Sequence, residues 1–211
     1  DLAMINYNAA GPYPSCFKNL TDAEKFEAHK KILSRNYDHL VLTANELQPL
    51  YVLPFAGAYV LSGKMGYKNK YLGTDTWDAC KAYTSSKLNN PIDVICLRDK
   101  DIFDLETGSA NNDYVPIDKR HMEKYIIEIS QLKYPYEEDN EPDMSILLHD
   151  IGRASLAMQE RMDKHGIKLN TEIFLKINGV EIAIHTPSLS NQKLVSELDN
   201  KLLRRIFDRK A

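Results

Sequence analysis

Three short apolar runs separated by helical segments constrain the fold of this chain more than any other feature. The runs are residues 2–7, 50–53 and 92–97. Continuous apolar runs of this length are typical of strands that are buried on both faces of a sheet. We therefore predict that the first run is a central strand. Strands that alternate with helices predict an α/β layered domain.

The segments between the runs carry helix signals. Thr21 and Glu24 have the spacing of a capping box, in which the hydroxyl and the carboxylate each accept a hydrogen bond from the other residue's backbone N–H. The helix that begins there is expected to end before Pro49. Asp75 is the expected cap of a second helix, and residues 102–105 predict a fourth strand.

Composition changes after about residue 108, and we expect two domains, residues 1–115 and 116–211. The second is an α+β accessory region. An apolar stripe from Leu147 to Met162 predicts a helix that ends at Gly166, and Asn178-Gly179 predicts a β-hairpin. A final amphipathic helix is expected to turn five apolar side chains inward: Leu194, Val195, Leu198, Leu202 and Ile206.

Charge and hydropathy exclude two classes of partner. The chain has 211 residues with 27 Lys and Arg against 30 Asp and Glu, a net charge of −3. This balance does not provide the one-signed field that draws proteins to nucleic acid, so we expect no nucleic-acid partner. No apolar run approaches the roughly 20 residues of a transmembrane helix, so we expect no membrane span.

Cysteine usage indicates the compartment. Cys16, Cys80 and Cys96 are odd in number and lack CxxC spacing, which argues against a disulfide framework and a structural zinc site. We expect a reducing, cytoplasmic location. Cys16 is the only cysteine in a candidate site loop. It would need a cation or a helix N-terminus nearby to act as a nucleophile, and the helix that begins at Thr21 is close in sequence.

The familiar catalytic motifs are absent. None of the six histidines has metal-ligand spacing, and the sequence contains no Gly-x-Ser-x-Gly elbow, phosphate loop or GxGxxG turn. The sequence therefore assigns no catalytic residue and no metal ligand.

Two loops that follow the first two apolar runs are the candidate binding site. Residues 9–14 and 54–59 place small and aromatic residues at the carboxyl ends of predicted strands, where open α/β sheets bind ligands. Equally, the Pro and Gly residues could serve tight turns alone. If the two strands are neighbours, the loops lie side by side. The candidate substrate-binding residues are Gly11, Tyr13, Phe55, Gly57 and Tyr59.

These same segments carry a resemblance. Residues 1–5 running into Ala10-Gly11-Pro12-Tyr13-Pro14-Ser15-Cys16-Phe17, followed by Leu50-Tyr51-Val52-Leu53-Pro54-Phe55-Ala56-Gly57-Ala58-Tyr59, resemble the C-terminal half of a metallo-β-lactamase-fold protein. The pattern is similar to that of CMP-N-acetylneuraminate hydroxylase-like members, which are related to ascorbate-6-phosphate lactonase-like enzymes. The similar stretch covers about residues 1–108.

The resemblance implies a fold and a metal. The fold would be the C-terminal half of an αββα sandwich, with zinc or iron in the full-length protein bound through an HxHxDH motif of the N-terminal half. This chain lacks that motif, and residues 54–57 stand without a histidine where many hydrolases of the fold have one. The implied function is part of a metal-dependent hydrolase or oxygenase-like enzyme acting on a polar sugar or phosphorylated small-molecule substrate, with the metal ligands outside this chain.

Other interpretations remain open. The chain could be a non-enzymatic module that binds a small molecule, a lipid or a protein on a degenerate metallo-β-lactamase fold. Residues 116–211 resemble, more weakly, the sterol-carrier-like modules of some bacterial members. A strand that starts at residue 2 leads us to expect a missing upstream part, which another chain could also supply as a partner half.

Overall fold

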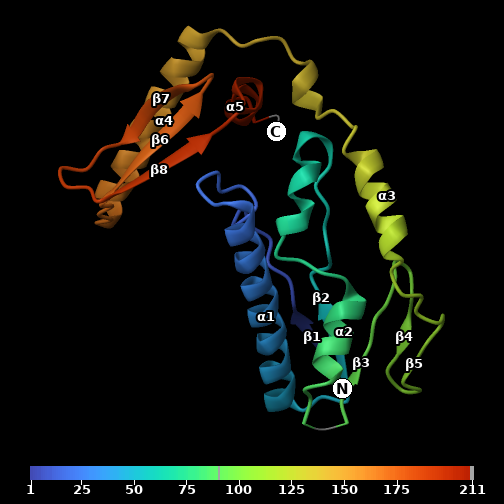
Figure 1. Cartoon of the computed structure of the whole chain (residues 1–211). Coiled ribbons are helices and arrows are strands. Elements are labelled where there is room, and N and C mark those ends of the chain that lie inside the picture. Colours follow the sequence, from blue (N-terminus) through green and yellow to red (C-terminus); the bar gives the residue numbers. More distant parts are fainter. Residues whose placement is uncertain (90, 210–211) are drawn as a thin grey trace. The chain divides into compact units, whose positions relative to one another are not determined.

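A computed structural model of the chain describes residues 1–89 and 91–209 (Figure 1). The chain forms two compact units, unit 1 (Asp1–Leu132) and unit 2 (Lys133–Ala211). The boundary therefore falls later than the expected one between residues 115 and 116. Helix α3 (Lys119–Ile129) belongs to unit 1 because it contacts the 3-10 helix η1 (Gly63–Tyr71).

Unit 1 is built on a parallel three-stranded sheet with the order β1 (Leu2–Asn6), β2 (Tyr51–Phe55), β3 (Asp93–Val94). Helices α1 (Asp22–Leu47) and α2 (Trp77–Ser85) connect the strands. The mixed α/β class is therefore confirmed. The prediction of a central first strand is wrong, because β1 lies at the edge of this sheet and β2 in the middle.

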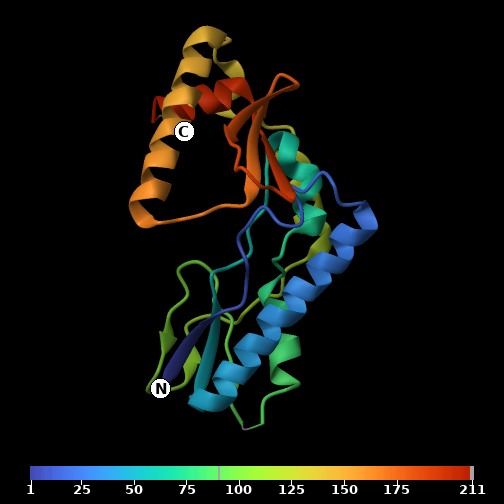
Figure 2. The ribbon, with the colours of Figure 1, turned by 90° about the vertical axis from the view of Figure 1, so that its left-hand side faces the viewer.

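One face of this sheet forms the core of unit 1. Helix α1 runs along one side of β1 and β2 (Figure 2), and alternate residues of these strands pack with side chains of α1 and α2. The fully or nearly fully buried members of this cluster are Ile5, Tyr7, Tyr37, Leu40, Ala44, Val52 and Cys80. The helices thus cover one face of the sheet.

The opposite face carries apolar side chains that remain partly exposed. In the register of β1 and β2, Met4 pairs with Leu53 and Asn6 with Phe55. Met4 is 58% exposed and Phe55 is 43% exposed. The first run was expected to be buried on both faces, but it is buried on one only. We call the surface formed by Leu2, Met4, Leu53 and Phe55 the open face. Tyr51 lies on the same side of the sheet, but its ring packs against Phe103, with centroids 4.9 Å apart.

Strand β2 continues through Pro54, where the sequence suggested that it stops. The Tyr51 amide donates to the carbonyl of Asp1, just before β1, whereas the Val52 carbonyl accepts from the Ile95 amide on the β3 side. Pro54 is two residues after Val52, so its backbone nitrogen faces the β3 side of the strand. Strand β3 pairs only with Tyr51 and Val52 and does not reach Pro54. A proline is tolerated there because its missing N–H would face a side where pairing has ended.

The helix caps agree with the sequence to within one residue. Thr21 and Glu24 form the predicted capping box at the start of α1. Helix α2 is capped by Thr76, whose hydroxyl accepts from the Ala79 amide, and not by Asp75.

Two predicted strands differ in extent or in pairing. The run 92–97 yields only the two residues of β3. The run 102–105 yields β4 (Phe103–Asp104), which pairs antiparallel with β5 (Ser109–Ala110) in a separate hairpin and does not extend the parallel sheet.

Unit 2 places a helix against a second three-stranded sheet. After η2 (Pro135–Glu138), the elements are α4 (Met144–His165), β6 (Thr171–Ile177), β7 (Val180–His185), β8 (Gln192–Glu197) and α5 (Asn200–Phe207), and the sheet order is β7-β6-β8. The core consists of Leu147, Ile151, Ile177 and Leu203.

Two turn predictions in unit 2 are confirmed. The hairpin turns at Asn178 and Gly179, whose φ values of 48° and 82° lie in the left-handed region that a type I′ turn requires. Helix α4 ends at Gly166, with a φ of 63°.

The predicted final helix begins too early. Leu194 and Val195 lie on β8 and are exposed, because β8 pairs in parallel with β6 and residues 192–197 are extended. The helix α5 begins only after Asp199, whose carboxylate accepts from the Lys201 and Leu202 amides. Leu202 and Ile206 do lie on this helix, but Ile206 is 45% exposed and does not turn inward. The buried leucine of the helix is Leu203, and Leu198 lies before the helix begins. In the part of the chain that the structure describes, no helix is long and apolar enough to cross a membrane.

Candidate functional site

The two candidate loops lie side by side, as predicted. Strands β1 and β2 are parallel neighbours, and Ile5 pairs with Pro54 and Asn6 with Phe55, so both strands end at the same edge of the sheet. The Asn8 side chain connects the loops, because its Nδ2 donates a hydrogen bond of 3.1 Å to the Ala56 carbonyl.

A third segment joins this edge just before α2. The Asn8 Oδ1 accepts from the Asp75 amide at 3.4 Å, and the Tyr7 hydroxyl donates to the Asp75 carbonyl at 3.2 Å. Asn8 is buried, so its amide group is held by the protein and not by solvent. Sequence reasoning did not single out Asn8. The available signal was an amide residue placed directly after an apolar strand.

The Asn8 bond coincides with strained backbone. Ala56 has a φ of 62°, in the left-handed region where a Cβ atom costs roughly 1–2 kcal/mol. The bond from Asn8 Nδ2 to the Ala56 carbonyl holds the peptide in this conformation. Such strain is often found at binding sites, where the surrounding structure holds the backbone in place.

The phenols beneath the edge are not proton donors for chemistry near neutral pH. Burial raises the pKa of Tyr7 and of Tyr37 well above the ordinary value of a phenol. Both side chains therefore remain neutral. Their rings stack with centroids 6.3 Å apart and form part of the core below the loops.

The five predicted site residues are in different environments. Gly11 is exposed, and a Cβ atom there would meet nothing within 4 Å. Tyr13 is 48% exposed and Phe55 is exposed, whereas Tyr59 is half-buried. At Gly57 a Cβ atom would lie 2.9 Å from Cζ2 of Trp77, so this glycine is needed for packing against α2. Gly11, Tyr13 and Phe55 thus remain accessible to a ligand.

Cys16 lies two residues after the first of these loops, and a cation does lie beside it. The Lys68 Nζ atom of η1 is 3.4 Å from the Cys16 Sγ atom. The sequence pointed to the helix that begins at Thr21 as the source of positive charge. Lys68 could not be identified from the sequence, because 52 residues separate it from Cys16.

The residues at this edge do not fit a zinc or iron ion. Zinc is bound mainly by His, Cys and carboxylate side chains, and iron sites use similar donors. The edge offers the amide of Asn8, backbone carbonyls and neutral phenols, while the Asp75 carboxylate accepts from the Thr76 amide. Across residues 1–89 and 91–209, no group of three or more His, Cys, Asp or Glu side chains could hold a metal.

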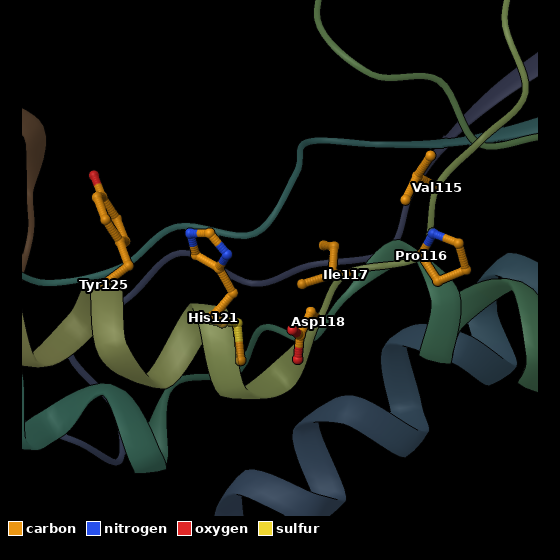
Figure 3. Close-up of a pocket in the computed structure, with 7 residues that line it drawn as sticks. Val115, Pro116, Ile117, Asp118, His121 and Tyr125 are labelled. Atoms are coloured by element: carbon orange, nitrogen blue, oxygen red, sulfur yellow. The ribbon is translucent and has the colours of Figure 1, made fainter.

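Apart from the sheet edge, a depression lies beside α3 (Figure 3). It has a volume of about 420 Å³ and is lined by Val115, Pro116, Ile117, Asp118, His121, Met122 and Tyr125. The side chains of His121 and Tyr125 extend from the same side of the helix. The Asp118 carboxylate caps α3 by accepting from the Arg120 amide. The depression is mainly apolar, and it lacks the several convergent polar groups that usually orient a small ligand.

Comparisons with known proteins identify no relative. No protein-family model matches the chain, and neither a curated protein nor a solved structure does. The candidate function is therefore argued from the geometry of the sheet edge and the open face.

Proposed function

We propose that unit 1 is the C-terminal half of a metallo-β-lactamase-like αββα sandwich. In this proposal it contributes the substrate-binding edge of a metal-dependent hydrolase or oxygenase-like enzyme. The substrate is a polar sugar or a phosphorylated small molecule. The metal ligands lie outside this chain, because the residues at the described edge do not fit a metal.

The open face carries this proposal. Parallel sheets are almost always covered on both faces, since their connections place helices there. Here α1 and α2 cover one face, while the other keeps Met4 and Phe55 more than one-third exposed. A second sheet packed on the open face would complete two inner layers between two layers of helices.

The residues of this chain would bind and orient the substrate. The backbone amides near Gly11 are placed at the carboxyl edge of the sheet, where they can donate to an anionic group. Tyr13 and Phe55 offer exposed rings for the apolar faces of a sugar. Asn8 fixes the spacing of the two loops through its bond to Ala56.

The open face is tested with the dye 8-anilinonaphthalene-1-sulfonate, whose fluorescence rises on apolar surface. We expect the purified chain to enhance the fluorescence and Met4→Lys to reduce the enhancement. The matched control is Leu156→Lys, at an exposed leucine of α4 in unit 2. Equal fluorescence for wild type and Met4→Lys would show that the open face is not available to a second layer.

The binding edge is tested by amide NMR with glucose 6-phosphate and with inorganic phosphate as probes. We expect shifts centred on Ala9, Gly11 and Ala56, and weaker binding for Gly11→Ala without loss of stability, because its Cβ meets no protein atom. Gly152→Ala in α4 is the control. Shifts confined to other parts of the chain, or none, would contradict the assignment.

A non-enzymatic binding module is the second candidate, and the donor set at the edge favours it. A degenerate fold that has lost its metal site would retain the same loops and the same substrate contacts. Metal analysis after incubation with zinc or ferrous iron and dialysis tests the shared expectation that this chain holds neither metal. Stoichiometric metal, or hydrolase turnover by the isolated chain, would overturn the placement of the ligands elsewhere.

A further inference from the structure

We propose that Cys16 is a reactive thiol that hydrogen peroxide oxidises to a sulfenic acid, and that the Lys68 ammonium is the positioning group that promotes this reaction. This modification site is independent of the function proposed above. It requires neither a metal nor a substrate at the sheet edge.

Lys68 is the unusual feature of this pair. Its side chain lies in η1, and the residue is only 9% exposed. Its neighbours are Cys16 Sγ at 3.4 Å and the Tyr67 ring, whose centroid is 5.8 Å from Nζ. Among the described residues, Lys68 has no carboxylate within ion-pair distance.

A buried ammonium without a carboxylate requires another source of negative charge. Buried charges in proteins are paired, because the cost of removing an isolated ion from water is large. The Cys16 sulfur is the one hydrogen-bond partner of Lys68 in the part of the chain that the structure describes. The sulfur of Cys16 therefore lies directly beside a positive charge, which is the kind of environment in which cysteines react as nucleophiles.

Ser15 adds a second donor beside the sulfur. Its Oγ atom is 3.8 Å from Cys16 Sγ and 3.3 Å from the Pro12 carbonyl, so its single proton serves one of these two acceptors at a time. Rotation of the hydroxyl toward Sγ would add a hydrogen bond to the negatively charged form.

The other two cysteines are less accessible than Cys16. Cys80 and Cys96 are buried, whereas Cys16 is partly exposed. Burial raises the pKa of Cys80 to about 12 and that of Cys96 to about 11, so both remain protonated near neutral pH. They are internal controls for a reaction that requires an accessible thiolate.

The oxidation balances with one peroxide molecule. The Cys16 thiolate attacks one oxygen of hydrogen peroxide, the S–O bond forms and the O–O bond breaks. Sulfur loses two electrons, and the peroxide is reduced. The departing hydroxide takes a proton from the sulfenic acid or from solvent and leaves as water. The net reaction converts a thiol and hydrogen peroxide into a sulfenic acid and water.

The test follows each cysteine by peptide mass spectrometry in the full chain at pH 7. After brief exposure to hydrogen peroxide with dimedone present, we expect the dimedone adduct on Cys16 and neither on Cys80 nor on Cys96. Iodoacetamide should likewise alkylate Cys16 at least about tenfold faster than the buried pair, which present less thiolate and less access. Equal labelling of all three cysteines, or no adduct on Cys16, would overturn the proposal.

Variants of Lys68 separate charge from access. We expect Lys68→Gln to slow both reactions of Cys16 by about tenfold at pH 7 and Lys68→Arg to restore much of the rate, since arginine keeps the positive charge. The Cys80 and Cys96 rates show whether each variant remains folded. If Lys68→Gln unfolds, the salt dependence of the wild-type rate replaces it, because screening weakens the attraction between the two groups. A Cys16 rate that neither substitution nor salt changes would exclude a role for Lys68.

Discussion

Asn8 joins three segments at the carboxyl edge of the parallel sheet with one side chain. We expect Asn8→Ala to lower the free energy of unfolding of unit 1 by about 1–2 kcal/mol, because the Ala56 carbonyl and the Asp75 amide each lose a part-buried hydrogen bond to the Asn8 side chain. Urea unfolding followed by circular dichroism measures the change. Asn19→Ala, at an exposed loop position, is the matched control and should have a near-neutral effect.

At the scale of single residues, the sequence predicted which loops meet but not which side chains join them. Gly57 was expected to admit a ligand, and the structure shows that its missing side chain makes room for Trp77, 20 positions later. The contact between Cys16 and Lys68 could not be predicted from the sequence either. Contacts between distant residues depend on how the helices close over the sheet, and local periodicity does not encode this.

At the scale of elements, the capping box of α1 makes its stability sensitive to pH. The pKa of Glu24 is lowered by hydrogen bonds from the Thr21 backbone N–H and then from its hydroxyl. A carboxylate with a lowered pKa stabilises the fold above its unfolded pKa of about 4.3, and this contribution disappears as the pH falls through the folded value.

The measurement compares wild type with Glu24→Gln by thermal unfolding at pH 7 and pH 3. The variant should be less stable at pH 7, and the difference should shrink at pH 3. Thr21→Ala should cost about 1 kcal/mol at pH 7, the usual effect of losing an N-cap hydroxyl. A difference between wild type and Glu24→Gln that is the same at both pH values would contradict this role of the carboxylate.

Two glycines of unit 2 should respond to alanine with opposite signs. Gly179→Ala should destabilise the hairpin by about 1–2 kcal/mol, because φ is 82° and only the backbone conformation is strained. Gly152→Ala, in the middle of α4 with open space around its Cβ, should stabilise by about 0.5–1 kcal/mol. Urea midpoints measure both changes, and a shared sign would show that backbone conformation does not control them.

Elements were predictable where a local signal specified them, as at the α1 capping box, the Gly166 stop and the Asn178-Gly179 turn. They were less predictable where tertiary pairing decides. Residues 194 and 195 fit the helical stripe that continues into α5, but pairing with β6 makes them part of a strand. Likewise, the composition of β1 does not reveal that it lies at the edge of its sheet, because covered edge strands and central strands have similar apolar runs.

At the scale of the whole molecule, the two units have separate cores. Leu40 of unit 1 and Leu147 of unit 2 are both fully buried in clusters that share no residue. We expect Leu40→Ala and Leu147→Ala each to destabilise its own unit by about 2–5 kcal/mol. Amide hydrogen exchange on the full chain should show faster exchange confined to the substituted unit. Faster exchange of the same size in both units would show that they unfold together.

The open face has a consequence for how this protein behaves at high concentration. Within residues 1–89 and 91–209, no strand pairs with the outer edge of β1, and the open face of the same sheet keeps Met4 and Phe55 exposed. Unpaired edge strands and exposed apolar patches are surfaces on which a second molecule can bind in place of a neighbouring strand or layer. Self-association through the open face and the β1 edge would compete with binding of a natural partner. A high concentration of this protein should therefore favour contacts between its own copies, and dilution should favour the partner.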